Sequence, residues 1–112
     1  MARTVTIADG ASLSGALAIP EGYFVSGIII PTTWTAAAVS FTVAVDNSGT
    51  FRSLFNTAGE VTFATDAAGR HLACKLDDFA GVRFLKVRSG VAAAAVNQVG
   101  ADRVIEVLIT QI

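Results

Sequence analysis

Residues 28–55 read IIIPTTWTAAAVSFTVAVDNSGTFRSLF, and this stretch decides the fold. Between residues 41 and 45, aromatic and β-branched side chains alternate with small or polar ones, which is typical of a half-buried β-strand. The DNSG segment at 46–49 has turn chemistry, because Asp and Asn bond their own backbone and Gly adopts positive φ. Residues 51–55 then resume a strand, so the stretch predicts a β-hairpin at the centre of a sheet.

The rest of the chain repeats this pattern of short apolar segments separated by turn residues. Further strands are predicted at 3–7, 13–19, 24–30, 61–64, 71–76, 82–89 and 102–111. Residues 77–81 predict a loop or a single helical turn, and residues 90–100, GVAAAAVNQVG, predict a long loop. We therefore expect one all-β domain over residues 1–112: an antiparallel β-sandwich of about nine short strands, with a small closed β-barrel as the alternative.

The composition is unusually apolar and poor in charge. Hydrophobic residues make up 53% of the chain and charged residues 15%, whereas globular domains average about 25% charged residues. So few charged groups would cover the surface of a small monomer poorly, which favours an oligomer or a subunit docked on a larger assembly. Abundant alanine is the alternative explanation, since alanine is tolerated on exposed surfaces.

Several classes of partner and compartment are disfavoured by the sequence. The net charge of −1 provides no basic surface for nucleic acid. No apolar run approaches the ~20 residues of a membrane helix, and the N-terminal MARTVTIADG lacks the apolar core of a signal peptide. The single cysteine, Cys74, cannot form an internal disulfide. We expect a soluble protein made in the cytoplasm, with no membrane partner.

Candidate catalytic residues are few. His71 is the only histidine and has no metal-ligand spacing around it, so a structural or surface role is expected. Cys74 has no CxxC partner and is expected to be a small buried residue. The Asp77–Asp78 pair fits a turn better than an acid–base dyad. The sequence therefore predicts no enzyme, no cofactor and no metal site.

Three segments together resemble a known family. They are residues 28–51, IIIPTTWTAAAVSFTVAVDNSGTF; residues 77–90, DDFAGVRFLKVRSG; and residues 92–109, AAAAVNQVGADRVIEVLI. In this order they resemble small structural proteins of tailed bacteriophages and prophages, of the capsid decoration or cement type. The resemblance implies a jelly-roll-like β-sandwich that binds the outer head of the virion, with the major capsid protein and its own copies, as a homotrimer, for partners. Synthesis would take place in the host cytoplasm.

The resemblance also directs attention to interface residues. Phe24, Ile29 and Trp34 are expected to anchor packing between subunits. Arg83, Lys86 and Arg88 are expected to face the capsid. The segment containing Val5 and Ile7 is expected to add a strand to the sheet edge of a neighbour.

Two other interpretations of these residues remain open. Five of the eight basic residues lie between positions 70 and 88, and this cluster fits a solvated surface as well as a docking surface. A carbohydrate-binding module is the alternative function, with Trp34 and Tyr23 contacting a glycan, as is a head–tail or tail subunit of the virion. Trp34 fits a core cap or a subunit interface better than a sugar platform.

Overall fold

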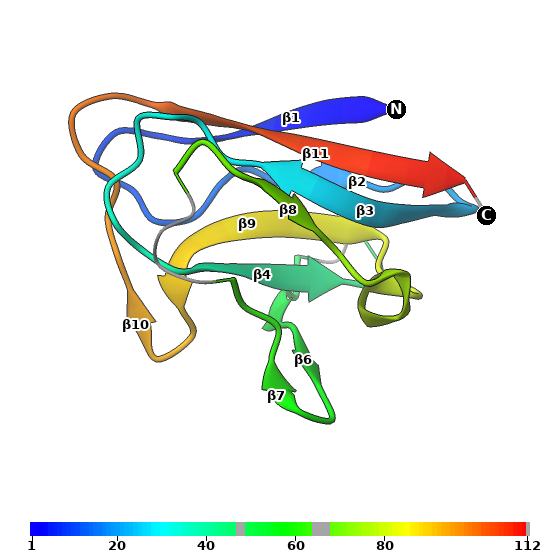
Figure 1. The fold of residues 1–112 in the computed structure, drawn as a ribbon. Coiled ribbons are helices and arrows are strands. Elements are labelled where there is room, and N and C mark those ends of the chain that lie inside the picture. The colour runs from blue at the N-terminus through cyan, green and yellow to red at the C-terminus, as the bar shows by residue number, and fades with distance from the viewer. Residues whose placement is uncertain (47–48, 64–67, 112) are drawn as a thin grey trace.

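The computed structural model describes residues 1–46, 49–63 and 68–111. Two antiparallel sheets stack as layers, and a small hairpin, β6–β7, projects from one side of the sandwich (Figure 1). The elements are β1 (Ala2–Ile7), β2 (Leu17–Ala18), β3 (Tyr23–Ile29), β4 (Val39–Ala44), β5 (Arg52–Ser53), β6 (Phe55–Asn56), β7 (Gly59–Glu60), β8 (His71–Ala73), the 3-10 turn η1 (Leu76–Phe79), β9 (Phe84–Val91), β10 (Ala94–Ala95) and β11 (Arg103–Gln111).

The first layer is a four-stranded sheet in the order β1-β11-β3-β8. The second layer has the order β10-β9-β4-β5, with β2 paired to β9. Every strand pairing is antiparallel in the part of the chain that the structure describes. The predicted all-β sandwich is confirmed, and the sheets do not close into the alternative barrel.

The core lies between the layers because each long strand turns alternate side chains inward. Ile105, Val107 and Ile109 of β11 are at most 1% exposed, as the alternation in the sequence predicts. From the opposite layer, the ring of Phe41 packs edge-on against Phe63 and Phe79, with centroids 6.2 and 5.2 Å apart. Phe79 reaches this position from η1, so the 3-10 turn closes one end of the core.

The central hairpin predicted over residues 41–55 is present. Thr42 pairs with Ser53 and Val43 with Arg52, so β4 and β5 are antiparallel neighbours. Gly49 has φ +90°, as the predicted turn requires. Asn47 and Ser48 of that turn lie outside the described residues, as do residues 64–67.

Two predicted strands are shorter than expected because the regular ladder is interrupted at Ser14 and at Leu54. The predicted strand 13–19 reduces to β2 and an isolated bridge at Leu13, and between them the Ser14 hydroxyl accepts the Val87 N–H at 2.9 Å. The predicted strand 51–55 is split between β5 and β6. Leu54 turns into the core at the break, and its N–H donates to the Phe41 carbonyl at 3.1 Å.

The predicted loop at 90–100 instead contains a second hairpin. Ala94 pairs with Val91 and Ala95 with Gly90, so β10 folds back on the end of β9. Gly90 has φ +95°, and a Cβ at this position would lie 2.5 Å from the Ala94 carbonyl oxygen. Alanine is a weak strand former, so the run of alanines does not predict a strand. The need for glycine at this turn comes from a close backbone contact, which the sequence does not show.

Replacing Phe41 tests whether this ring is central to the core. We expect Phe41→Ala to lower the free energy of unfolding by about 3–5 kcal/mol, because the fully buried ring would leave a cavity. Phe55→Ala is the matched control, since Phe55 is 59% exposed and its loss should cost under about 0.5 kcal/mol. Urea denaturation gives both values, and similar costs for the two variants would contradict this account of the core.

Candidate functional site

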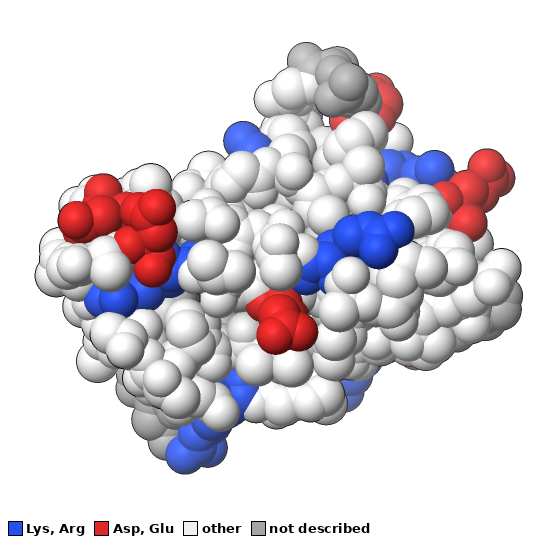
Figure 2. All heavy atoms as spheres, turned by 90° about the horizontal axis from the view of Figure 1, so that it is seen from above, with Lys and Arg blue, Asp and Glu red and all other residues white. Residues whose placement is uncertain are grey.

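The outer face of the four-stranded sheet carries few charged side chains. Its side chains alternate with the core residues of the same strands. They belong to Ala2, Thr4, Thr6, Phe24, Ser26, Ile29, His71, Ala73, Val104, Glu106, Leu108 and Thr110. Glu106 is the one acidic residue among them, and none is Lys or Arg. Figure 2 views the molecule from this side and shows broad uncharged areas between scattered charged groups.

The strand register arranges these side chains in rows across the sheet. Thr4, Glu106, Ile29 and His71 form one row, and Thr6 and Val104 form part of another. Val104 is 53% exposed, which is high for a valine. The surface is therefore mostly methyl and hydroxyl groups around a single carboxylate.

Two hydroxyl groups on this face are hydrogen-bonded to each other. The Thr110 hydroxyl donates to Ser26 Oγ at 2.8 Å, and Ser26 Oγ donates to the Leu108 carbonyl at 3.2 Å. His71 is exposed, and a Cβ placed on Gly27 would lie 2.8 Å from its Nε2, so the imidazole covers the backbone of β3. Such a surface suits contact with another protein surface of low charge.

Two of the predicted interface residues lie on this face. Phe24 and Ile29 point outward from β3 and are half-buried. Val5 and Ile7 point inward from β1 and are 6% and 0% exposed, so their side chains belong to the core. Whether any of these four residues contacts a partner stays a prediction.

Trp34 lies in the core cluster and is 9% exposed. Its Nε1 donates to the Ala37 carbonyl at 3.3 Å, which satisfies the polar handle of the ring. This position fits the core-cap role, which is one of the two roles expected for Trp34, the other being a subunit interface. In this position the ring presents no open face on which a sugar could stack.

The predicted basic cluster is divided between different environments. Arg88 is 9% exposed and lies under the β6–β7 hairpin, where NH2 is 2.7 Å from Glu60 Oε2. Its Nε donates to Ser40 Oγ at 2.8 Å and its NH1 to Ser53 Oγ at 3.2 Å. The Glu60 carboxylate also accepts the Ala92 N–H at 2.9 Å. Arg88 therefore joins β4, β5, β7 and the β9–β10 turn.

Lys86 and Arg83 have separate positions. Lys86 shares the outward side of β9 with Arg88, and its ammonium lies 4.4 Å from the centroid of the Phe51 ring. Arg83 is half-buried and precedes β9, where its N–H donates to the Ala44 carbonyl at 3.1 Å. The three predicted capsid-facing side chains do not form one continuous basic patch.

Gln98 is a second buried polar centre, and sequence reasoning gave it no role. Its side chain is fully buried, and Oε1 accepts the Thr35 N–H at 2.7 Å and Arg103 Nε at 3.1 Å. Its Nε2 donates to the Thr35 carbonyl at 2.9 Å and Ser89 Oγ at 2.8 Å. The amide thus uses its donors and acceptors to hold the Trp34 loop against β9 and β11. The VNQ segment of the resemblance has a structural role.

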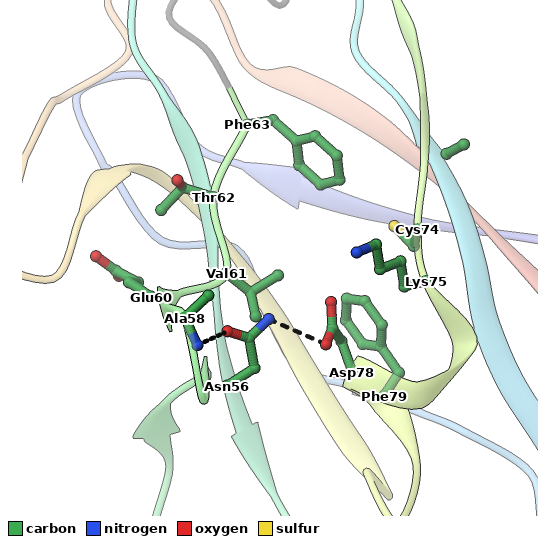
Figure 3. Close-up of a pocket in the computed structure, with 11 residues that line it drawn as sticks. Asn56, Ala58, Glu60, Val61, Thr62, Phe63, Cys74, Lys75, Asp78 and Phe79 are labelled. Atoms are coloured by element: carbon green, nitrogen blue, oxygen red, sulfur yellow. Dashed lines mark hydrogen bonds between the residues drawn. The ribbon is translucent and has the colours of Figure 1, made fainter.

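A pocket of about 240 Å³ lies between the β6–β7 hairpin and η1 (Figure 3). Val61 and Phe79 line its apolar part, and Lys75 and Asp78 contribute charged groups. Asn56 Nδ2 donates to Asp78 Oδ1 at 3.1 Å, which ties the hairpin to the 3-10 turn. Asp78 acts here as a hydrogen-bond acceptor that positions the hairpin.

Cys74 also lines this pocket, but its thiol is a poor nucleophile. Burial, together with the nearby carboxylate of Asp78, raises the pKa of Cys74 to about 12. At neutral pH the sulfur therefore keeps its proton. Because the thiolate is the reactive form of cysteine, the protonated Cys74 is a poor nucleophile. Sγ lies 3.8 Å from the Leu72 carbonyl oxygen, as expected for a weak donor.

Within residues 1–46, 49–63 and 68–111, no three His, Cys, Asp or Glu side chains are grouped in a way that could hold a metal ion. No helix in the described part of the chain is long and apolar enough to cross a membrane.

Comparison with known proteins identifies the fold and little else. No family model matches the chain, and no curated protein matches it in sequence. Among solved structures, the chain is similar to the SPBc2 prophage-derived protein YomS, with a TM-score of 0.53 and 11% sequence identity. The match covers 98% of this chain and 96% of YomS, so the likeness extends over the whole sandwich. At this identity the match establishes a shared fold.

Replacing Arg88 tests the buried ion pair. We expect Arg88→Ala to lower the free energy of unfolding by about 3 kcal/mol, because it leaves the Glu60 carboxylate without its cation. Lys86→Ala, on the same side of the same strand, should cost about 0.5–1 kcal/mol. The double variant Arg88→Met/Glu60→Leu should recover most of the loss. Equal costs for the two single variants in urea denaturation would argue against this role.

Cys74 gives a prediction about pH. In the unfolded chain the thiol ionises near its ordinary pKa of 9.0, whereas the folded protein keeps the proton up to about pH 12. The contribution of Cys74 to stability should therefore be constant below pH 9 and fall as pH rises from 9 towards 12. Denaturation at pH 8 and pH 10 measures this fall, and Cys74→Ala should reduce it. Iodoacetamide should also label the folded protein at pH 8 at least about tenfold more slowly than the urea-unfolded chain.

Proposed function

We propose that this protein is a non-enzymatic structural protein of a tailed-bacteriophage virion, a capsid decoration protein that binds the outer surface of the head. The outer face of the four-stranded sheet is the docking surface, and the major capsid protein is the partner. The observation that carries the proposal is the exposure of Val104 on a sheet face where Glu106 is the one charged residue.

Apolar side chains that are exposed to water on a sheet face are unfavourable in free energy. Side chains such as Val104, Leu108, Ile29 and Phe24 gain stability when a partner removes them from water, at about 25 cal/mol per Å² of apolar surface. A stable protein interface buries roughly 800 Å² on each partner, which is the scale of one sheet face. The rigid strands hold these side chains in fixed positions, so little ordering is needed on binding.

The fold supports the same proposal. The whole chain shares its architecture with YomS, a protein derived from a prophage. The three sequence segments described above resemble small virion proteins, and Trp34 and Gln98 within them serve packing in this structure. A protein with this role needs a stable scaffold and a binding surface, and no catalytic group.

The proposed surface differs from the one first expected from the basic residues. Arg88 is engaged with Glu60, and Lys86 lies over Phe51, so neither is an unengaged cation available to an acidic capsid surface. Shape and apolar contact therefore dominate the proposed docking, and the partner supplies a cation opposite Glu106.

Two exposed valines provide a matched test. Heads assembled without this protein are mixed with the purified chain, and bound protein is measured by sedimentation. Val104→Lys should weaken binding at least tenfold, because it places an ammonium within the docking surface. Val45→Lys should leave binding unchanged, since Val45 is 76% exposed at the end of β4, away from this face. Failure of the wild-type protein to bind heads, or equal effects of the two variants, would refute the proposal.

A further inference from the structure

The edge of β1 differs from the other sheet edges. β1 is an edge strand of six residues, whereas the edge strands β8, β10 and β5 have three, two and two. An exposed edge offers unpaired N–H and C=O groups to any other strand, and proteins normally shorten, cover or charge such edges. Three of the four edges follow this rule by being short. β1 carries one charged residue, Arg3, and contains neither proline nor a bulge.

The register shows which backbone groups of β1 point outward. Met1 and Ile109 exchange both backbone hydrogen bonds, at 3.2 and 2.9 Å. Such pairs alternate along an antiparallel ladder, so Arg3, Val5 and Ile7 also direct their backbone groups towards β11. Thr4 and Thr6 therefore direct theirs away from the sheet. In the part of the chain that the structure describes, the strand pairings assign no partner strand to this side of β1.

We propose that β1 pairs with β1 of a second copy of this chain, antiparallel and around a two-fold axis at Thr6. In this arrangement Thr6 and the partner's Thr6 exchange two backbone hydrogen bonds. Val5 then lies level with the partner's Ile7, and both side chains keep their places in the core of their own copy. The two four-stranded sheets become one continuous sheet of eight strands, and the contact is closed because both copies use the same residues.

Charge complementarity selects this register over its neighbours. Outward backbone groups must face each other, so Thr4 and Thr6 can pair only with even-numbered positions. With the axis at Thr6, Arg3 lies level with the partner's Asp9, which follows the end of β1 in the turn closed by the Ala11 N–H and the Ala8 carbonyl, and Asp9 lies level with the partner's Arg3. Both residues are exposed, and one oxygen of Asp9 accepts the Gly100 N–H at 2.9 Å while the carboxylate keeps a second oxygen. A shift that moves the axis to Val5 places Arg3 opposite the partner's Ile7 and forms no charge pair.

Charge-reversal variants test both whether the partner is a second copy of this chain and whether the two strands pair in this register. Light scattering after size exclusion gives the dimer dissociation constant over a dilution series. Arg3→Glu and Asp9→Lys should each weaken the dimer roughly tenfold or more, because like charges then face each other twice. An equimolar mixture of the two variants should restore association, since every facing pair is again opposite in sign. Arg52→Glu is the control, because it makes the same charge change at an exposed position away from β1.

Amide exchange of the unmodified protein gives a second test that needs no variant. The amides of Thr4 and Thr6 should exchange quickly in dilute protein and slowly in concentrated protein, whereas those of Val5 and Ile7 should be slow in both. A chain that stays monomeric at millimolar concentration, or a dimer that Arg3→Glu and Arg52→Glu weaken equally, would overturn the proposal. So would Thr4 and Thr6 amides whose exchange does not depend on concentration. None of these outcomes depends on whether the protein binds phage heads.

Discussion

The Arg88 guanidinium is the contact on which the arrangement of the second sheet depends. It donates to Ser40 and Ser53 and forms the ion pair with Glu60, so one side chain fixes β4, β5 and the β6–β7 hairpin relative to β9. The Glu60 carboxylate also accepts the Ala92 N–H, which holds the β9–β10 turn in place. Because both charges are largely buried, each needs the other, and the hairpin cannot leave the sheet without exposing an unpaired ion. A charged pair that would ordinarily lie in solvent is thus used to hold four segments together.

Polar side chains inside the fold include two arginines. Arg88 and Arg103 are both buried, and Arg103 donates to Gln98 and to the Val99 carbonyl. Charges that fix the fold are not available to the surface, and the outer face of the four-stranded sheet retains Glu106 alone. Buried polar contacts thus hold the sandwich together, and the outer face of the four-stranded sheet presents mainly uncharged side chains.

The long strands could be predicted from sequence because their periodicity is local. The alternation of Leu85 and Val87 with Lys86 and Arg88, and of Ile105, Val107 and Ile109 with their neighbours, predicts the correct inward faces. The polar centres could not be predicted, since Glu60 lies 28 residues from Arg88 and Gln98 lies 63 residues from Thr35. No spacing rule connects such pairs before the fold is known. Trp34 was ambiguous for the same reason: the sequence shows an aromatic residue in a loop but not which surface the loop covers.

The β6–β7 hairpin has one more consequence. Its attachment depends on Asn56 at one side and Glu60 at the other, while Thr57 and Ala58 at its tip are exposed and stand clear of both sheets (Figure 1). Exposed loop tips of this kind tolerate added sequence. A foreign peptide inserted between Thr57 and Ala58 would be carried outward by the scaffold without entering either layer. An inserted epitope would then lie on the outside of the scaffold, which makes the tip a natural position for antigen display.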